Sequence, residues 1–147
     1  MILVLDTTDP QTLRFGISIN GLRIKKSEAH HPKKDERLDA TALLLRFLKK
    51  HTTGNDLSGV IVRDAAGTFS GVRLGILLTN ALALSENIPV TAVKISGTPS
   101  LTQLLHKGAV VLKRSTAGVY LIPRYHKAPN ISKSKVRRMP QRIRHQR

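Results

Sequence analysis

The first part of the chain has the spacing of apolar residues that predicts β-strands. Residues 2–6 form an apolar run that ends at Asp6, which is the pattern of a buried strand. Residues 12–19 alternate between apolar and polar side chains, which is typical of a strand with one buried face. Asn20-Gly21 then predicts a tight turn into a third strand. Residues 2–29 are therefore expected to form a three-stranded antiparallel meander.

The middle of the chain changes between helical spacing and short apolar runs. Residues 35–51 predict a helix with acidic residues in its first turn and basic residues in its last, which suits the helix dipole. Residues 69–86 predict a second helix. Between them, residues 57–64 predict a strand that is apolar on both faces and therefore central. Residues 89–95 predict a fifth strand.

The pattern after residue 97 predicts three shorter elements. Residues 98–107 suggest a short helix, with Thr98 as its cap and Pro99 at its first position. Residues 108–114 and 117–123 then suggest a closing β-hairpin.

The predicted order of elements is β-β-β-α-β-α-β. Its β-α-β links require right-handed crossovers. This combination indicates an α/β domain with an RNase H-like fold, which is also a single lobe of the actin-like (ASKHA) ATPases, built on a mixed five-stranded sheet. We therefore expect one lobe over residues 1–122 and a basic, extended tail over residues 123–147.

Charge separates the two ends of the chain. The net charge is +16 over 147 residues. Residues 1–86 hold 12 Lys or Arg against 9 Asp or Glu, whereas residues 87–147 hold 13 Lys or Arg and no acidic residue. Such an excess indicates a polyanionic partner, most commonly RNA or DNA, although a solubilising tail has the same composition. The candidate RNA-binding residues are Lys127, Lys133, Lys135, Arg137, Arg138, Arg142 and Arg144.

The amino-acid composition limits the chemistry and the cellular location that we expect. The sequence has no cysteine, which removes disulfides and thiolate chemistry. The N-terminus lacks the pattern of a signal peptide, and the longest apolar segment is too short for a membrane span. We therefore expect a cytoplasmic protein without a membrane partner.

The stretch AGTFSGVRLG, residues 66–75, lies where a strand meets a helix. Phosphate-binding loops occupy such positions, but this stretch lacks the GxxxxGK[ST] pattern. Gly67 and Gly71 are expected instead to allow a sharp turn and a close approach of helix to sheet. Thr68 is the expected helix cap, and Arg73 is expected to meet a carboxylate or a carbonyl, because a cation near a helix N-terminus is unfavourable.

The helix predicted at residues 69–86 is apolar almost all the way round. One face must cover the sheet, and the other would pack on the helix at residues 35–51 or remain exposed. Exposed apolar surface of this kind marks a partner interface. The two helices could thus form a four-helix bundle with another subunit.

Three segments resemble the bacterial TsaB (YeaZ) family of the Gcp-like/M22 group, which is needed for threonylcarbamoyladenosine in tRNA. They are residues 2–8, 36–48 and 57–93. The family motif GPGSFTGxRxG corresponds here to Ala66–Gly75, with Ala65-Ala66 where the motif has its first Gly-Pro. Residues 121–133 resemble the family's C-terminal end more weakly. The chain looks like a one-lobe version, because the stretch between about residues 105 and 120 is too short for a second lobe.

The resemblance implies a non-catalytic role. Proteins like TsaB pair with a TsaD-like transferase through helices of the first lobe and work with a TsaE-like ATPase. The same helices could also pair two copies of this chain. The implied interface residues are Leu38, Leu45, Phe69, Val72, Arg73, Ile76, Leu77 and Asn80.

Few residues support a catalytic function in place of the accessory role. An actin-like phosphate hairpin needs glycine after the first strand, but none occurs before Gly16. An RNase H-like nuclease would bring together Asp6 and Asp64, with Glu36 or Asp39, around two divalent ions. The histidines lack metal-ligand spacing, so we expect no metal and no cofactor. A repurposed RNA-binding protein, unrelated to tRNA modification, is the main alternative.

Overall fold

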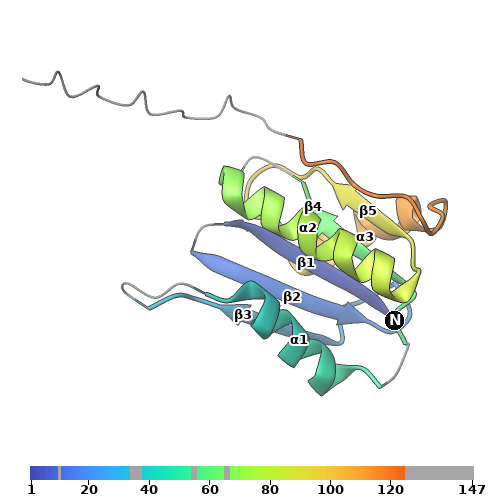
Figure 1. Cartoon of the computed structure of the whole chain (residues 1–147), viewed down its shortest axis with the longest axis horizontal. Helices are drawn as coiled ribbons and strands as arrows, with labels where there is room; N and C mark the ends of the chain where they lie inside the picture. The colour runs from blue at the N-terminus through green and yellow to red at the C-terminus, as the bar shows by residue number, and fades with distance from the viewer. Residues whose placement is uncertain (10, 34–37, 54–55, 65–66, 125–147) are drawn as a thin grey trace, which may run out of the picture.

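The computed structural model describes residues 1–9, 11–33, 38–53, 56–64 and 67–124. In these residues, five strands form a single sheet, and three helices pack against its two faces (Figure 1). In chain order the elements are β1 (Ile2–Asp9), β2 (Thr12–Ser18), β3 (Lys26–His30), α1 (Ala40–His51), β4 (Gly59–Arg63), α2 (Phe69–Glu86), β5 (Val90–Val93) and α3 (Leu101–Leu112).

The sheet has the strand order β3-β2-β1-β4-β5. β1 pairs antiparallel with β2 and parallel with β4, so the sheet is mixed, with β1 at its centre. β5 extends the parallel half and β3 the antiparallel half. This arrangement confirms the RNase H-like lobe and the five-stranded sheet that the order of elements predicted.

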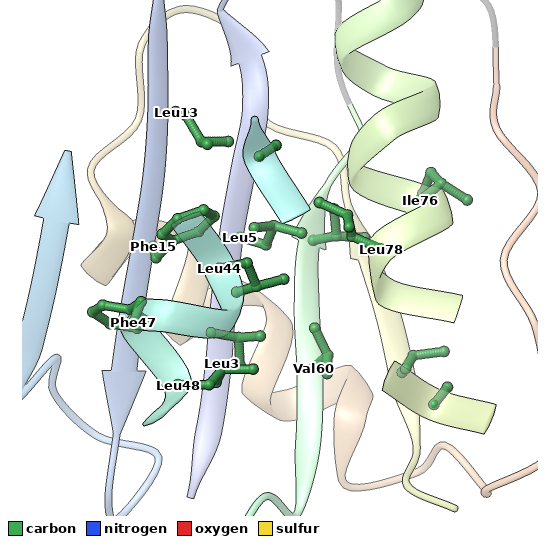
Figure 2. Packing of buried hydrophobic residues seen from close by; sticks show 14 of the residues in the cluster. Leu3, Leu5, Leu13, Phe15, Leu44, Phe47, Leu48, Val60, Ile76 and Leu78 are labelled. Atoms are coloured by element: carbon green, nitrogen blue, oxygen red, sulfur yellow. The ribbon is translucent and has the colours of Figure 1, made fainter. Parts of the chain in front are cut away.

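The two faces of the sheet carry separate parts of the core. Because neighbouring side chains of a strand point to opposite faces, Leu3 and Leu5 of β1 lie under α1 and α2, whereas Val4 lies under α3. α1 packs over β2, and α2 over β1 and β4 (Figure 1). Figure 2 shows the larger cluster, in which Phe15 and Phe47 pack together with ring centroids 5.6 Å apart.

The predicted start of the first helix is wrong. α1 begins at Ala40, because the Asp39 side chain accepts a hydrogen bond from the Ala42 N–H and acts as the N-cap. The first turn consequently contains no acidic residue, whereas the basic residues predicted for the last turn are present. Residues 34–37, on which the rest of this prediction depended, lie outside the described part of the chain.

The turn after β2 is longer than a two-residue hairpin. Ile17 pairs with Lys26, so residues 19–25 form the connection and β3 begins later than predicted. The Asn20 carboxamide accepts a hydrogen bond from the Leu22 N–H, and Gly21 has a φ of 72°. The Asn-Gly signal thus marks a turn correctly, but the turn lies within a wider loop.

The short helix and closing hairpin predicted after residue 97 are replaced by one helix. Ser100, rather than Thr98, caps α3, and it forms a capping box with Gln103. Gly108 did not end the helix, since a Cβ there would lie 2.4 Å from Ile61 and the helix therefore uses glycine to approach β4. Residues 119–124 are extended but lie along α2 and pair with no strand.

Candidate functional site

Residues 67–75 fasten the start of α2 onto the end of β1. A Cβ on Gly67 would lie 2.5 Å from the backbone oxygen of Thr8, and one on Gly71 would lie 2.3 Å from that of Thr7. A Cβ on Gly75 would lie 2.4 Å from Thr7 Oγ1. The three glycines recur at intervals of four, so they bring helix and strand closer than side chains would permit.

The hydrogen bonds of this turn are made within the protein. Thr7 Oγ1 donates to the Gly71 oxygen over 2.7 Å, and the Thr68 N–H donates to the Thr8 oxygen over 3.1 Å. Thr68 Oγ1 accepts from the Gly71 N–H, which confirms it as the cap of α2. The turn therefore serves helix–strand packing, as the glycine spacing predicted.

A hollow of about 670 Å³ lies beside this turn. Hydroxyl groups of Thr12, Thr68 and Ser70 line one side of it. Among the described residues, its lining contains the carboxylate of Asp9 and no lysine or arginine. That charge is unfavourable for a phosphate, although the hydroxyls could bind a neutral polar group.

Asp6 lies fully buried between two arginines. Arg14 donates to Asp6 Oδ2, and Arg63 Nη1 lies 3.3 Å from the same oxygen. Thr8 donates both its N–H and its hydroxyl to Oδ1. Burial alone would raise the pKa of Asp6, but the Thr8 hydrogen bonds and the Arg14 charge outweigh it and hold the pKa below its usual range. The carboxylate is thus a structural anion that pairs with both Arg14 and Arg63.

The candidate nuclease residues have separate roles in the described part of the chain, where Asp6 is bound to two arginines. Arg63 extends from Asp6 to the carbonyl oxygens of Ile95 and Gly97, while buried Asp64 Oδ1 has no hydrogen-bond partner. Asp39 caps α1, and Glu36 lies outside the described residues. Within the described ranges, no group of three His, Cys, Asp or Glu side chains could hold a metal ion.

One stripe of α2 is apolar and exposed. Leu77 and Leu84, spaced by two turns, are 67% and 70% exposed, and Phe69 at the start of the helix is also exposed. Arg73 lies between Phe69 and Leu77, with its guanidinium 5.5 Å from the centre of the Phe69 ring. Arg73 was expected to meet a carboxylate or a carbonyl, and the contact found is this cation–π pair.

Two of the predicted interface residues are in the core instead. Val72 and Ile76 are 4% and 1% exposed, because they lie on the side of α2 that faces the sheet. A side chain buried at this level cannot contact another protein. The sequence did not separate the two sides of α2, since apolar residues occur all round the helix.

The predicted interface residues outside α2 also differ in how exposed they are. Leu45 of α1 is half exposed, while its neighbour Leu44 is buried in the core. Leu38, which precedes α1, is half-buried against the core and lines the hollow beside the glycine turn. Leu45 is therefore available at the surface, and Leu38 is available only in part.

A segment that the sequence analysis assigned to a hairpin lies against the exposed stripe of α2. We call residues 119–124 the strap. Asn80 holds it with two hydrogen bonds of 2.9 Å, one from its Nδ2 to the Leu121 oxygen and one from the Leu121 N–H to its Oδ1. Pro123 and Leu77 line one open hollow of about 690 Å³. In Figure 1 the strap runs along α2 in orange.

The strap was missed because its signal is long-range. Asn80 and Leu121 are 41 residues apart, and a single asparagine on an apolar helix does not indicate its partner. The predicted RNA-binding residues begin just after the strap and lie outside the described residues. In the described ranges, no helix is both long and apolar enough to pass through a membrane.

Comparison with known proteins gives a likeness in fold. No protein-family model matches the sequence, and neither does any curated protein. The structure is similar to that of YeaZ from Pseudomonas aeruginosa, with a TM-score of 0.53, 21% identity, and coverage of 63% of this chain and 43% of YeaZ. An uncharacterized protein described as similar to the peptidase YEAZ from Pseudomonas aeruginosa matches equally well and is covered over 42% of its length. The chain thus spans less than half the length of either neighbour, and the likeness shows a shared fold.

Proposed function

We propose that this protein is a non-catalytic accessory subunit for threonylcarbamoyladenosine modification at position 37 of tRNA. In this proposal it pairs with a TsaD-like transferase and works alongside a TsaE-like ATPase. The YeaZ-like fold supports the proposal, as does the glycine-containing turn at residues 66–75, which the sequence shares in order and context with the TsaB family.

The observation that carries the proposal is the exposed stripe of α2. Leu77 and Leu84 remain in water although α2 is already anchored to the sheet by its other side. Burial of each leucine against a partner would contribute about 1.5–3 kcal/mol. Together with Phe69 at the start of the same helix, these side chains offer the centre of a helical interface.

A scaffold role agrees with the chemistry of the buried polar groups. Asp6 is paired with two arginines, and the Thr7 hydroxyl of β1 is hydrogen-bonded to α2. These groups stabilise the fold that presents α2.

The C-terminal charge gives the scaffold a second role. Residues 123–147 hold nine Lys or Arg and no acid, which suits contact with tRNA phosphates. Such contacts would hold tRNA near the transferase without reading its sequence.

The test is co-elution of the chain with the TsaD-like protein of the same cell, measured by size exclusion with light scattering. We expect a complex that Leu77→Glu abolishes, because a carboxylate would be buried at the centre of the interface. Val110→Glu is the matched control, since Val110 is 61% exposed on α3, which packs on the other face of the sheet. Absence of a complex with the unaltered chain would overturn the proposal.

The charge asymmetry favours a second candidate, an RNA-binding protein unconnected with this modification. It predicts tight, salt-dependent RNA binding without any complex with a TsaD-like protein. A chain that elutes as a homodimer, and whose dimer Leu77→Glu dissociates, would instead assign the α2 face to self-pairing.

A further inference from the structure

We propose that the strap forms the second half of the docking surface on α2. In this arrangement the partner contacts Ile122 and Pro123 of the strap together with Leu77 and Arg73 of the helix. The inference rests on the proposed function, because it requires a protein partner at α2, and it adds a non-helical segment to that interface.

The first observation is how firmly the strap is held. The Asn80 carboxamide satisfies both the N–H and the carbonyl oxygen of Leu121, as a paired strand would. The Leu121 side chain packs against the larger core cluster. A segment fixed by its backbone and by one side chain is ordered before a partner arrives, so binding costs less conformational entropy.

The second observation is which side chains the strap leaves in solvent. Ile122 is 82% exposed, although it lies between the anchored Leu121 and Pro123, and Tyr120 is also exposed. Pro123 lines the open hollow that it shares with Phe69 and Leu77. The exposed apolar surface of α2 therefore reaches the strap at Pro123, next to the exposed Ile122, and a partner seated on the helix at this hollow would meet the strap as well.

The third observation is the charge of this surface. Arg73 is the charged side chain in the described lining of the hollow. It lies in the second turn of α2, on the exposed side of the helix. The fitting partner element thus presents a large apolar side chain to the hollow, with a carboxylate next to it that reaches Arg73.

Two substitutions test the inference in the complex with the TsaD-like protein. Ile122→Glu should weaken the complex by tenfold or more, because the exposed Ile122 would become a charge buried at the interface. Arg73→Gln should weaken it roughly tenfold and make the dissociation constant less dependent on salt. Affinity is measured by calorimetry at two salt concentrations.

The controls separate this inference from the proposed function. Ile122 and Arg73 are exposed, so thermal unfolding of both variants should match that of the unaltered chain. Arg23→Gln removes an equal charge from the exposed loop after β2, which lies at the opposite end of β1 from the start of α2, and should leave affinity unchanged.

The outcomes are distinct. If Leu77→Glu abolishes the complex while Ile122→Glu and Arg73→Gln bind as tightly as the unaltered chain, the strap lies outside the interface and the inference is wrong, but the proposed function stands. If the unaltered chain forms no complex, both are overturned. Loss of affinity in Ile122→Glu on the strap and in Arg73→Gln on the helix, with Arg23→Gln unaffected, supports the composite surface.

Discussion

The three glycines at the start of α2 determine how closely that helix approaches β1. Gly67 and Gly71 both face a backbone oxygen, which cannot rotate away as a side chain can, and Gly71 is the more constrained because a Cβ there would lie only 2.3 Å from that oxygen. This property could be predicted from sequence, since glycines at a strand-to-helix turn indicate close packing.

We expect Gly71→Ala to destabilise the fold by about 1–3 kcal/mol, the usual cost of overpacking. The direction of the change in stability is informative, because at an unconstrained helix position alanine is more favourable than glycine by about 1 kcal/mol. Urea unfolding followed by circular dichroism measures the change. Ser70→Ala, at an exposed position in the same turn, should have little effect. Equal stability of Gly71→Ala and the unaltered chain would contradict the close contact.

The buried charges were only partly predictable. Asp6 stood out at the end of an apolar run, but its partners come from β2 and β4, which only the folded sheet brings together. The sequence alone therefore left a nuclease alternative in which Asp6 would bind metal, whereas the structure has an ion pair.

Asp6 should make stability depend on pH in the acid range. Its pKa is lower in the folded chain than in the unfolded chain, so the carboxylate stabilises the fold above about pH 4, and this stabilisation is lost as the pH falls through the folded-state pKa. Asp6→Asn should lower the free energy of unfolding at pH 7 by about 2–3 kcal/mol and flatten its decline below pH 4. Asp9→Asn, on the same strand, is the control for a general charge effect. An unchanged acid profile in Asp6→Asn would refute this assignment.

At the scale of elements, the strands and α2 were predicted well and the region after β5 was not. Alternation and apolar runs are local signals, and they correctly placed β1, β2 and β4. The stretch 108–114 was misread because Gly108 and two adjacent valines suggest a turn and a strand. Tertiary packing decided otherwise, since Leu104, Leu105 and Leu112 share one buried side of α3.

The capping box at Ser100 should contribute measurably to α3. Ser100→Ala removes the acceptor for the Gln103 N–H, and we expect a loss of about 1 kcal/mol in the free energy of unfolding. Thr102→Ala, exposed in the same turn, should change stability much less. Chemical denaturation of both variants provides the comparison, and an equal loss in the two would argue against a specific cap.

At the scale of the whole molecule, charge is unevenly distributed along the chain. The sequence alone shows that the C-terminal part has no acidic residue. It does not show the path that the chain takes along α2 before this basic segment. The strap shows that the last described residue, Arg124, follows directly from the α2 face. The hydrogen bonds between Asn80 and Leu121 join residues that are 41 positions apart, so no local sequence pattern could have predicted them.

RNA binding should depend steeply on salt if the C-terminal basic residues contact phosphates. Removal of residues 130–147 takes away seven Lys or Arg and should reduce the slope of log affinity against log salt by at most about 5. Filter binding or fluorescence anisotropy with tRNA over a salt series measures the slope. A chain of full length with these basic residues changed to serine controls for length. An unaltered slope would show that RNA binding, if present, uses the folded lobe.

The central place of β1 also bears on how the protein is made. Leu3 and Leu5 are synthesised before the two helices that cover them, since α1 begins at Ala40 and α2 at Phe69. On the ribosome, the apolar side chains of β1 therefore stay uncovered until these helices have been made. This nascent segment is where a chaperone has most to protect, and where slow translation would most favour aggregation.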